Sequence, residues 1–381
     1  MRLGKDGSVS ALAIYVENTV PNLILEESVL GRMFIDMAGK DPKEVYQAVE
    51  ANSLGLSEAQ PLQTREEGMN AMLAGNLLLL VEGYDKGLKI GSKGYPARSV
   101  DNTDTEKVLR GSNEGFTESV KTNTALIRKR IRSTDMKVEE LTAGVRSNTR
   151  LVLVYMKELV YPEVLEQIRR GIDQFVIDGV LDSGIIEQLT EEDWVSPVPQ
   201  FHTTERPDLA AMEVLDGRVV LLCDNSPVAL LLPSVFQDFM NVTEDRYNRF
   251  EIASFERVIR YAAMIFSFLL SGTYLAVIGF HTMILPTNLI LSFAESRQGV
   301  PFPSLLEVLF MELAFELIRE AGIRMPGALS GTIGIVGGLI IGDAAVSANL
   351  VSPMAVVIVA LSALSSFATV SYTHLTLPTI A

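Results

Sequence analysis

The sequence predicts an α/β soluble region of two similar tandem subdomains, followed by an α-helical polytopic membrane domain. Charge-rich sequence extends to about residue 260, whereas residues 261–294 and 344–381 contain no Asp, Glu, Lys or Arg. Because a bilayer core about 30 Å thick needs only ~20 apolar residues per helix, runs of this length indicate membrane helices. In the soluble region, a pattern of strands and helices recurs after 140 to 142 residues. The predicted parts, from the first subdomain to a short tail, are 1–98, 99–134, 135–245, 246–372 and 373–381.

A strand followed by a helix opens each subdomain. Apolar residues at 12–16 precede a Pro-containing turn and a helical pattern over 25–37, and the same order returns at 151–156 and 163–174. Short apolar runs bounded by Asn, Asp, Gly and Pro are typical of strands.

A helix followed by a hairpin closes each subdomain. Residues 69–81 resemble residues 209–222, with Gly75 and Gly217 near the ends of the two helices. Gly suits this place because a helix C-terminus often needs a residue with positive φ. Chance similarity of two α/β patterns is the alternative explanation of the repeat.

A polar linker with a basic helix is predicted over residues 99–134. The helix starts after a turn near Phe116 and ends in the cluster Arg128-Lys129-Arg130-Ile131-Arg132. Cations at a helix C-terminus are favourable through the helix dipole. Contact with a neighbouring subunit or with anionic headgroups is the alternative role of this cluster.

Three membrane spans are predicted, at about residues 258–283, 328–350 and 353–372. Basic residues gather just before the first span and are then absent until Arg297. By the positive-inside rule, this distribution places the soluble region in the cytoplasm. The basic residues before the span are Arg246, Arg249, Arg257 and Arg260.

An acid-bearing helix is predicted over residues 303–324, between the first two spans. At 100° per residue, Glu312, Glu316 and Glu320 fall within an arc of 80°. Carboxylates facing lipid would cost several kcal/mol, so they should face protein or a water-filled cavity, where a row of acids attracts cations. An amphipathic helix at the membrane surface, with its glutamates in water, is the alternative. The candidates for an ion pathway are Glu307, Glu312, Glu316 and Asp343, which follows the second span's last glycine.

Small residues recur every four positions along the second span. Such a stripe permits close approach of another helix, and plain helix packing is its simplest role. The residues of the stripe are Ser330, Gly334, Gly338 and Gly342.

Composition and motifs exclude several classes of protein. The formal net charge is −15, and an acidic soluble region argues against a nucleic-acid partner. The three histidines lack metal-ligand spacing, and neither a P-loop nor a G-x-S-x-G motif is present. Cys223 lies in an apolar run and is expected to be a buried core thiol. We therefore predict no enzyme activity, no metal and no cofactor.

Several motifs resemble the GerA family of bacterial spore germination proteins. They are residues 110–118 (RGSNEGFTE), 123–131, 204–208 (TERPD), 296–303 and 334–346. Ser112 stands where family members usually carry Pro. The resemblance covers nearly the whole chain. The residues singled out as family motif or subunit contact are Arg110, Gly111, Glu114, Gly115, Phe116, Asn123, Arg128 and Arg130.

The resemblance implies the A subunit of a nutrient germinant receptor in the spore inner membrane. Its partners would be receptor B and C subunits, membrane lipid and further copies of itself in an oligomeric ion channel. A stage V sporulation protein AF paralogue would have the same architecture. A transporter-like permease and a non-conducting scaffold are the alternative functions. Because family members continue with more membrane sequence, the membrane domain is expected to be truncated, and the tail 373–381 is expected to be non-native.

Overall fold

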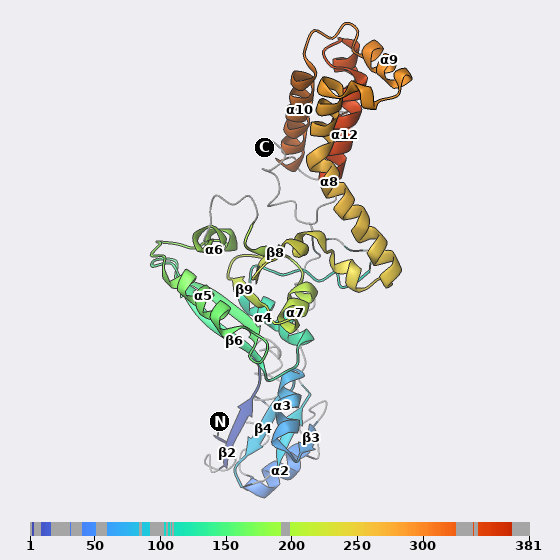
Figure 1. The fold of residues 1–381 in the computed structure, drawn as a ribbon. Helices are drawn as coiled ribbons and strands as arrows, with labels where there is room; N and C mark the ends of the chain where they lie inside the picture. The colour runs from blue at the N-terminus through green and yellow to red at the C-terminus, as the bar shows by residue number, and fades with distance from the viewer. Residues whose placement is uncertain are drawn as a thin grey trace. The chain divides into compact units, whose positions relative to one another are not determined.

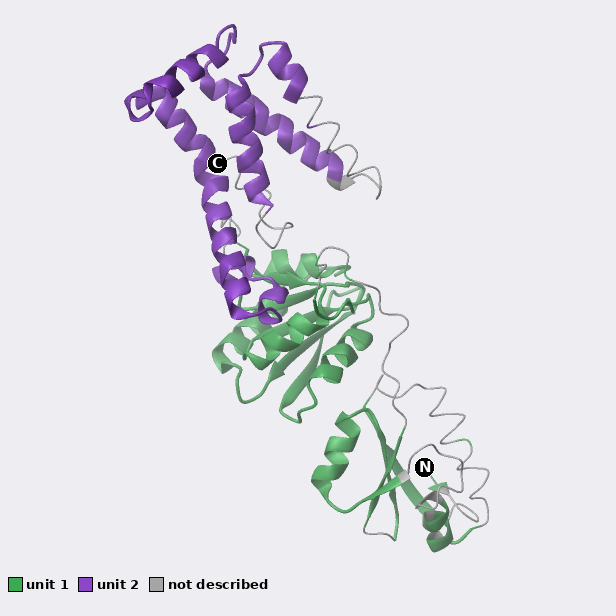
Figure 2. Cartoon of the chain, turned by 90° about the vertical axis from the view of Figure 1, so that its right-hand side faces the viewer, with its two compact units in different colours: residues 1–235 green, residues 236–381 purple. Residues whose placement is uncertain are grey.

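The protein divides into two compact units in the computed structural model, residues 1–235 and 236–381 (Figure 2). The units are described separately. The structure describes residues 2–3, 9–16, 31, 40–50, 59–83, 86–91, 103, 106, 108, 110–191, 199–324, 338 and 342–367.

Two five-stranded sheets form the first unit, and both have the same strand order (Figure 1). The order is β1-β2-β4-β5-β3 in the first sheet and β6-β7-β9-β10-β8 in the second, with neighbouring strands antiparallel. The first subdomain consists of β1 (Arg2–Leu3), β2 (Val9–Ile14), α2 (Pro42–Glu50), β3 (Ala59–Leu62), α3 (Arg65–Leu73), β4 (Leu77–Val81) and β5 (Gly87–Ile90). The second consists of α4 (Val120–Arg130), β6 (Met136–Ala143), β7 (Thr149–Met156), α5 (Pro162–Asp173), α6 (Ser183–Thr190), β8 (His202–Thr204), α7 (Pro207–Leu215), β9 (Val219–Cys223) and β10 (Ala229–Leu232).

Corresponding glycines end α3 and α7. Gly75 has φ +83° and Gly217 has φ +91°, so both adopt the left-handed conformation that the sequence predicted at these helix ends. At Gly217 a side chain would also meet the carbonyl oxygen of Leu159 at 3.0 Å. The prediction of an α/β soluble region is confirmed.

Helices cover both faces of the second sheet (Figure 1). Val152 and Val154 of β7 pack with α4 and α7, whereas Leu151 and Leu153 pack with α5 and α6. Alternate strand residues point to opposite faces of a sheet. Since both faces are covered, β7 and β9 read as continuous apolar runs rather than as alternating ones.

Helix α4 belongs to the second subdomain and not to a separate linker. Its residues Val120, Leu126 and Ile127 are 2% exposed or less and lie in the same core cluster as β7 and β9. The sequence analysis took residues 99–134 as a linker because this segment is polar and lies between the two similar subdomains. The apolar side of the helix packs into the core, while Lys129 and Arg130 are half-buried and pair with Glu114. Residues 110–134 therefore form part of the second subdomain's fold.

The second unit is helical. The 3₁₀ helices η3 and η4 contact the start of α8, which explains why this unit begins before the predicted boundary at residue 245. Asp245, in η4, is buried and accepts hydrogen bonds from Arg260 of α8. The elements are η3 (Phe236–Met240), η4 (Thr243–Arg246), α8 (Phe250–Phe280), η5 (Thr282–Ile284), α9 (Thr287–Ser296), α10 (Ser304–Arg324) and α12 (Pro353–Ser366).

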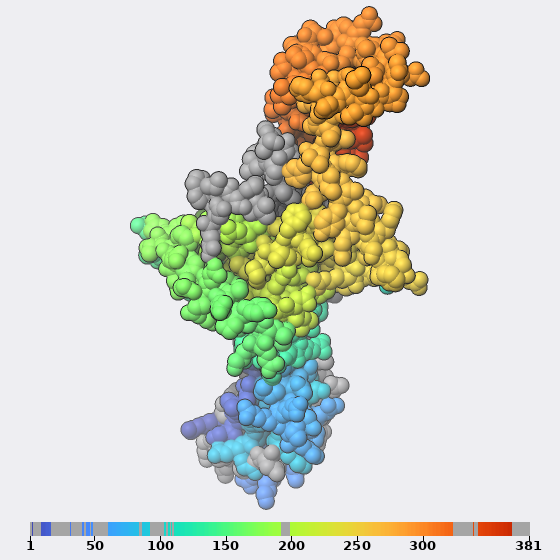
Figure 3. Space-filling view, in the orientation of Figure 1, coloured from blue at the N-terminus to red at the C-terminus, as the bar shows by residue number. Residues whose placement is uncertain are grey.

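Helix α8 is long and apolar enough to cross a membrane, and among the described residues it alone meets both criteria. Only 6% of its most apolar stretch is buried inside the protein, so its apolar side chains lie at the surface of the unit, drawn in yellow and orange in Figure 3. The third predicted span corresponds to α12, an apolar helix of 14 residues. Most of the second predicted span, residues 328–350, lies outside the described residues.

Candidate functional site

Two of the sequence motifs meet at a buried arginine in the second subdomain. Arg206, the residue before α7, is 1% exposed. Its guanidinium donates to the carbonyl oxygens of Glu106 (3.0 Å) and Ser112 (2.9 Å) and to the Asp208 carboxylate (2.8 Å). Arg206 thereby fastens the segment that contains motif 110–118 to the motif TERPD.

Glu106 completes this contact from the other side. Its carboxylate accepts hydrogen bonds from the Thr204 hydroxyl (2.6 Å) and from the backbone N–H of Glu205 (3.0 Å). Burial raises the pKa of Glu106 above its ordinary value despite these bonds. We call the group formed by Glu106, Thr204, Arg206 and Asp208 the Arg206 clasp.

The basic cluster at the end of α4 is largely paired within the chain. Glu114 accepts hydrogen bonds from Lys129 (2.6 Å) and from Arg130 (2.7 Å), and Arg130 also donates to the hydroxyl of Ser112 (3.1 Å). Burial works to raise the pKa of Glu114, but the hydrogen bonds from the two cations outweigh it and hold this pKa below its ordinary value. These contacts favour a structural role for Glu114 and Arg130.

The other motif residues divide into buried and accessible ones. Gly115 and Phe116 are buried, and the Phe116 backbone N–H donates to the carbonyl of Glu205 at 2.8 Å. Asn123 is 1% exposed and bridges the Thr117 backbone, accepting from its N–H at 2.8 Å and donating to its carbonyl. The accessible motif residues are Arg110, Gly111 and, half-buried, Arg128.

In the helical unit, Glu307 differs from the other predicted acids in its contacts. It is 1% exposed, and one carboxylate oxygen accepts from Arg297 at 3.0 Å. The other oxygen accepts from the backbone N–H (3.0 Å) and the hydroxyl (2.8 Å) of Ser352, the N-cap of α12. Glu307 therefore joins α10 to the start of α12 and to Arg297, which lies in the motif 296–303. The sequence analysis did not identify this ion pair.

Glu312 and Glu316 line a cavity of about 290 Å³ between α8, α10 and α12. Arg319 also lines it and donates a hydrogen bond to Glu316. Glu312 is half-buried and has no hydrogen-bond or ion-pair partner among the residues that the structure describes. The remaining lining consists of serines and apolar residues: Ser267, Leu309, Leu313, Phe315, Val359, Ser362, Ala363 and Ser366.

The structure places Asp343 and the glycine stripe only in part. Asp343 is exposed, in the helical turn that precedes α12. A side chain at Gly342 would meet Val356 of α12 at 3.8 Å, whereas one at Gly338 would meet no described residue within 4 Å. Ser330 and Gly334 lie outside the described residues.

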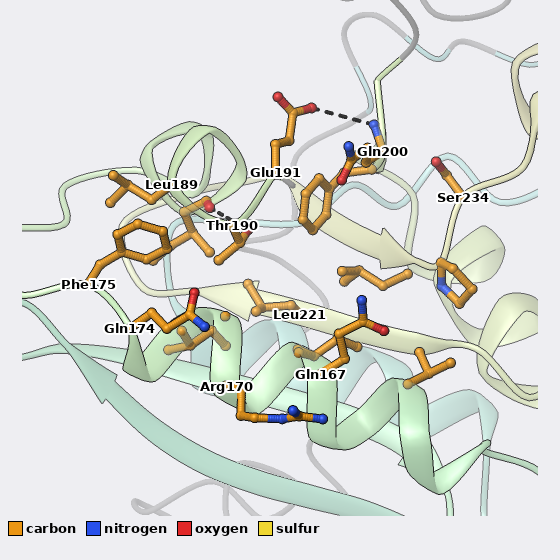
Figure 4. Close-up of a pocket in the computed structure, with 18 of the residues that line it drawn as sticks. Gln167, Arg170, Gln174, Phe175, Leu189, Thr190, Glu191, Gln200, Leu221 and Ser234 are labelled. Carbon is orange, nitrogen blue, oxygen red and sulfur yellow. Dashed lines mark hydrogen bonds between the residues drawn. The ribbon is translucent and has the colours of Figure 1, made fainter. Parts of the chain in front are cut away.

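A groove of about 720 Å³ lies between α5 and α6, over β9 and β10 (Figure 4). Its polar lining comes mostly from carboxamides and hydroxyls, and its floor includes the apolar Leu221. Arg170 donates to the carbonyl of Glu166, and Glu191 accepts from the backbone N–H of Gln200. An uncharged molecule with hydrogen-bond donors and acceptors matches this lining. The polar side chains are Gln167, Gln174, Thr190, Gln200 and Ser234.

Sequence reasoning missed this groove because its side chains come from five separated segments of the chain and form no motif. It identified Glu312 and Glu316 because acids in an apolar helix are conspicuous at any spacing. Chemically, the cavity around these two acids suits a cation, since it combines carboxylates with serine hydroxyls. Among the described residues no cluster of His, Cys, Asp or Glu has the makings of a metal site.

Comparison with known proteins gives a consistent picture. The family model for the Bacillus/Clostridium GerA spore germination protein matches residues 1–379. Spore germination protein KA of Bacillus subtilis (strain 168) is 35% identical over 372 residues, which are 98% of this chain and 68% of that protein. The uncharacterized membrane protein YfkQ of the same organism is 36% identical, over 93% of this chain and 69% of that protein. Spore germination protein GerLA of Bacillus cereus is 38% identical, over 85% of this chain and 66% of that protein.

A solved structure also matches. It is the N-terminal domain of the A subunit of the Bacillus megaterium spore germinant receptor GerK3, with 25% sequence identity and a TM-score of 0.45. The match covers 62% of this chain and 86% of that one.

Proposed function

Because this chain belongs to the GerA family of spore germination proteins, we propose that it is the A-type membrane subunit of a germinant receptor and contributes a cation pathway to it. The pathway passes the cavity lined by Glu312 and Glu316. Its partners are receptor B and C subunits, further copies of this chain and lipid. Its place is the spore inner membrane, with the soluble region in the cytoplasm. The observation that carries the proposal is the acid-lined cavity inside an apolar helical unit.

Membrane association rests on α8. Its long apolar surface is left uncovered by the described part of the chain, and contiguous apolar surface of this extent is typical of contact with lipid or with other subunits. Helix α10 likewise exposes leucines. The exposed leucines of α10 are Leu305, Leu306, Leu309, Leu313 and Leu317.

Cation binding rests on Glu312. A carboxylate in apolar surroundings needs water, a cation, a partner or a proton, since its desolvation is costly. Glu316 is paired with Arg319, but Glu312 has no such partner among the described residues. The cavity therefore favours a cation over an anion.

Oligomerisation rests on the incomplete enclosure of this site. The helices around the cavity expose apolar surface, and the pathway would be completed by neighbouring copies. Gly338 supplies a point of close approach, because no described residue would meet a side chain there within 4 Å. For contact with other subunits we propose the accessible motif residues Arg110, Gly111 and Arg128.

The test is ion release from spores of a host that lacks its own A-type subunits and carries this gene. Glu312→Gln and Glu316→Gln should each reduce nutrient-triggered K⁺ release at unchanged protein level, because size and helix propensity are kept while the charge is lost. Glu320→Gln is the matched control, since Glu320 is exposed on the same helix and does not line the cavity. K⁺ release equal to that of the unmodified chain in both cavity variants would support a non-conducting scaffold. Release that depends on a co-transported solute would support a permease.

A further inference from the structure

We propose that Arg319 is a tethered counter-ion that offsets one of the two negative charges of the acid-lined cavity and holds the cation pathway closed until nutrient binding displaces it. The inference rests on the proposed function and specifies how that function is regulated.

The position of Arg319 is unusual for an arginine on an apolar helix. Long basic side chains at membrane depth normally extend towards water. The Arg319 side chain is instead only 13% exposed and donates to the Glu316 carboxylate, whose side chain is 26% exposed. Both side chains line the cavity shared by α8, α10 and α12. Arg319 thus places its guanidinium where a transported cation would bind.

Charge balance follows from this placement. Two carboxylates and one guanidinium give the cavity a formal charge of −1, and removal of the guanidinium changes this to −2. Repulsion between a guanidinium and a cation a few ångströms away is strong wherever water is partly excluded. A cation is therefore admitted more readily when Arg319 has left.

The guanidinium cannot be switched off by deprotonation, because arginine stays protonated in proteins. Opening must therefore be a movement of the side chain or of α10 relative to α12, whose Ser362 and Ser366 form the opposite wall. Ser362 also donates a hydrogen bond to the carbonyl of Ser267 in α8 at 3.0 Å, so the wall is fixed to a second helix.

An ordinary structural ion pair is the competing explanation, since residues three apart on a helix pair commonly and weakly. The two explanations predict different changes in K⁺ loss. Arg319→Gln and Glu316→Gln break the same pair, so a structural role predicts similar consequences for both. A tethered counter-ion predicts opposite ones, because the first variant makes the cavity more negative and the second makes it less so.

The experiment measures K⁺ loss from dormant spores that carry the full-length protein, before and after a rich nutrient mixture is added. We expect Arg319→Gln to raise loss before nutrient by roughly tenfold, as removal of a nearby like charge allows. Glu316→Gln should not raise it and should reduce the release after nutrient. The double variant Glu316→Gln/Arg319→Gln restores the formal charge of −1 and should return loss before nutrient to near the original level. Arg319→Lys keeps the charge, so its K⁺ loss before nutrient should also stay near the original level. It is the variant to measure if Arg319→Gln does not accumulate.

Unchanged or lower K⁺ loss before nutrient in Arg319→Gln, at normal protein level, would overturn the inference. So would a leak of equal size in Arg319→Gln and Glu316→Gln, or increased loss in Arg319→Lys. The proposed function has a separate outcome, because it fails if Glu312→Gln and Glu316→Gln both leave nutrient-triggered release intact. If Glu312→Gln reduces K⁺ release after nutrient and Arg319→Gln shows no increased K⁺ loss before nutrient, the counter-ion role of Arg319 is refuted and the proposed function is not.

Discussion

The second subdomain and the helical unit arrange the same kinds of residue in opposite ways. In the subdomain, a sheet of apolar strands is covered on both faces by helices of the chain, and Arg206 finds partners inside the fold. In the helical unit, the apolar surface of α8 is left outside and Glu312 is unpaired within the described residues. The first arrangement is stabilised by the chain itself, whereas the second leaves apolar surface and a carboxylate that the described residues neither cover nor pair.

The largest effect is expected in the subdomain, at the Arg206 clasp. Arg206→Ala removes the cation from a buried carboxylate and from two carbonyls, which should lower the free energy of unfolding by roughly 3–5 kcal/mol. Thermal and denaturant unfolding of residues 1–235 measures this. Arg146→Ala is the control, because its ion pair with Asp178 has side chains 82% and 76% exposed and should contribute almost nothing. Equal stabilities of the two variants would mean that the clasp does not hold the subdomain together.

Glu307 is an exception within the helical unit, because it resembles Arg206: it is a buried charged residue whose partners lie inside the fold. Glu307→Gln leaves Arg297 without a carboxylate in a buried site and weakens the cap of α12, so a cost of about 3 kcal/mol is expected. Such a loss lowers steady-state abundance several-fold. Immunoblots of membranes should show less Glu307→Gln protein and normal amounts of Glu312→Gln protein. Normal abundance of both variants would mean that Glu307, like a solvated acid, contributes little to the stability of the helical unit.

Glu187 allows a direct comparison with the acids of the helical unit, because it is a buried acid of the second subdomain. Burial, with the nearby Glu191 and Asp182, raises the pKa of Glu187 from 4.5 to about 7. A raised folded-state pKa means that the folded protein binds this proton more tightly than the unfolded chain does. Stability is therefore highest in acid and falls as pH rises from about 5 to 8, by up to about 3 kcal/mol for this group.

Glu187→Gln should accordingly raise the melting temperature of residues 1–235 at about pH 8 and change it little at about pH 5. Thermal unfolding at the two pH values checks this, with Glu163→Gln, an exposed position on α5, as the control. A gain of the same size at both pH values would show that Glu187 is not protonated in the folded protein near neutrality.

Features with a local or periodic signature could be predicted from the sequence. The strands at 12–16 and 151–156 overlap β2 and β7, the apolar run at 258–283 overlaps α8, and the acid-bearing helix at 303–324 overlaps α10. In each case hydrophobicity or turn residues alone determine the pattern. The positive φ of Gly75 and Gly217 follows from the same reasoning, because a helix that ends before a hairpin needs it.

Contacts between distant segments could not be predicted. Arg206 binds residues about a hundred positions earlier in the chain, and Glu307 binds Ser352, 45 positions later. Such pairs leave no periodicity. Helix α4 was taken for a linker because it lies in a polar segment whose basic end is more conspicuous than the buried apolar residues of the helix. The acids of α10 could be identified from the sequence, but it could not be predicted which of them is paired inside the fold. The difference between Glu307 and Glu312 lies entirely in their partners.

The smallest effect on the chain itself is expected at Gly338, and it tests whether the uncovered surface of the helical unit meets another subunit. A side chain there meets none of the described residues within 4 Å, so we expect Gly338→Leu not to destabilise the single chain, and its helix propensity is up to about 1 kcal/mol better. At Gly342 a side chain touches Val356 at 3.8 Å, so Gly342→Leu should disturb packing against α12 and serves as the within-chain control. If copies of this protein pack through Gly338, the leucine keeps them apart. Mass measurements in detergent micelles should then show abundant Gly338→Leu protein with fewer copies per particle, whereas Gly338→Ala retains the original size. A Gly338→Leu protein with unchanged copy number would assign this surface to lipid.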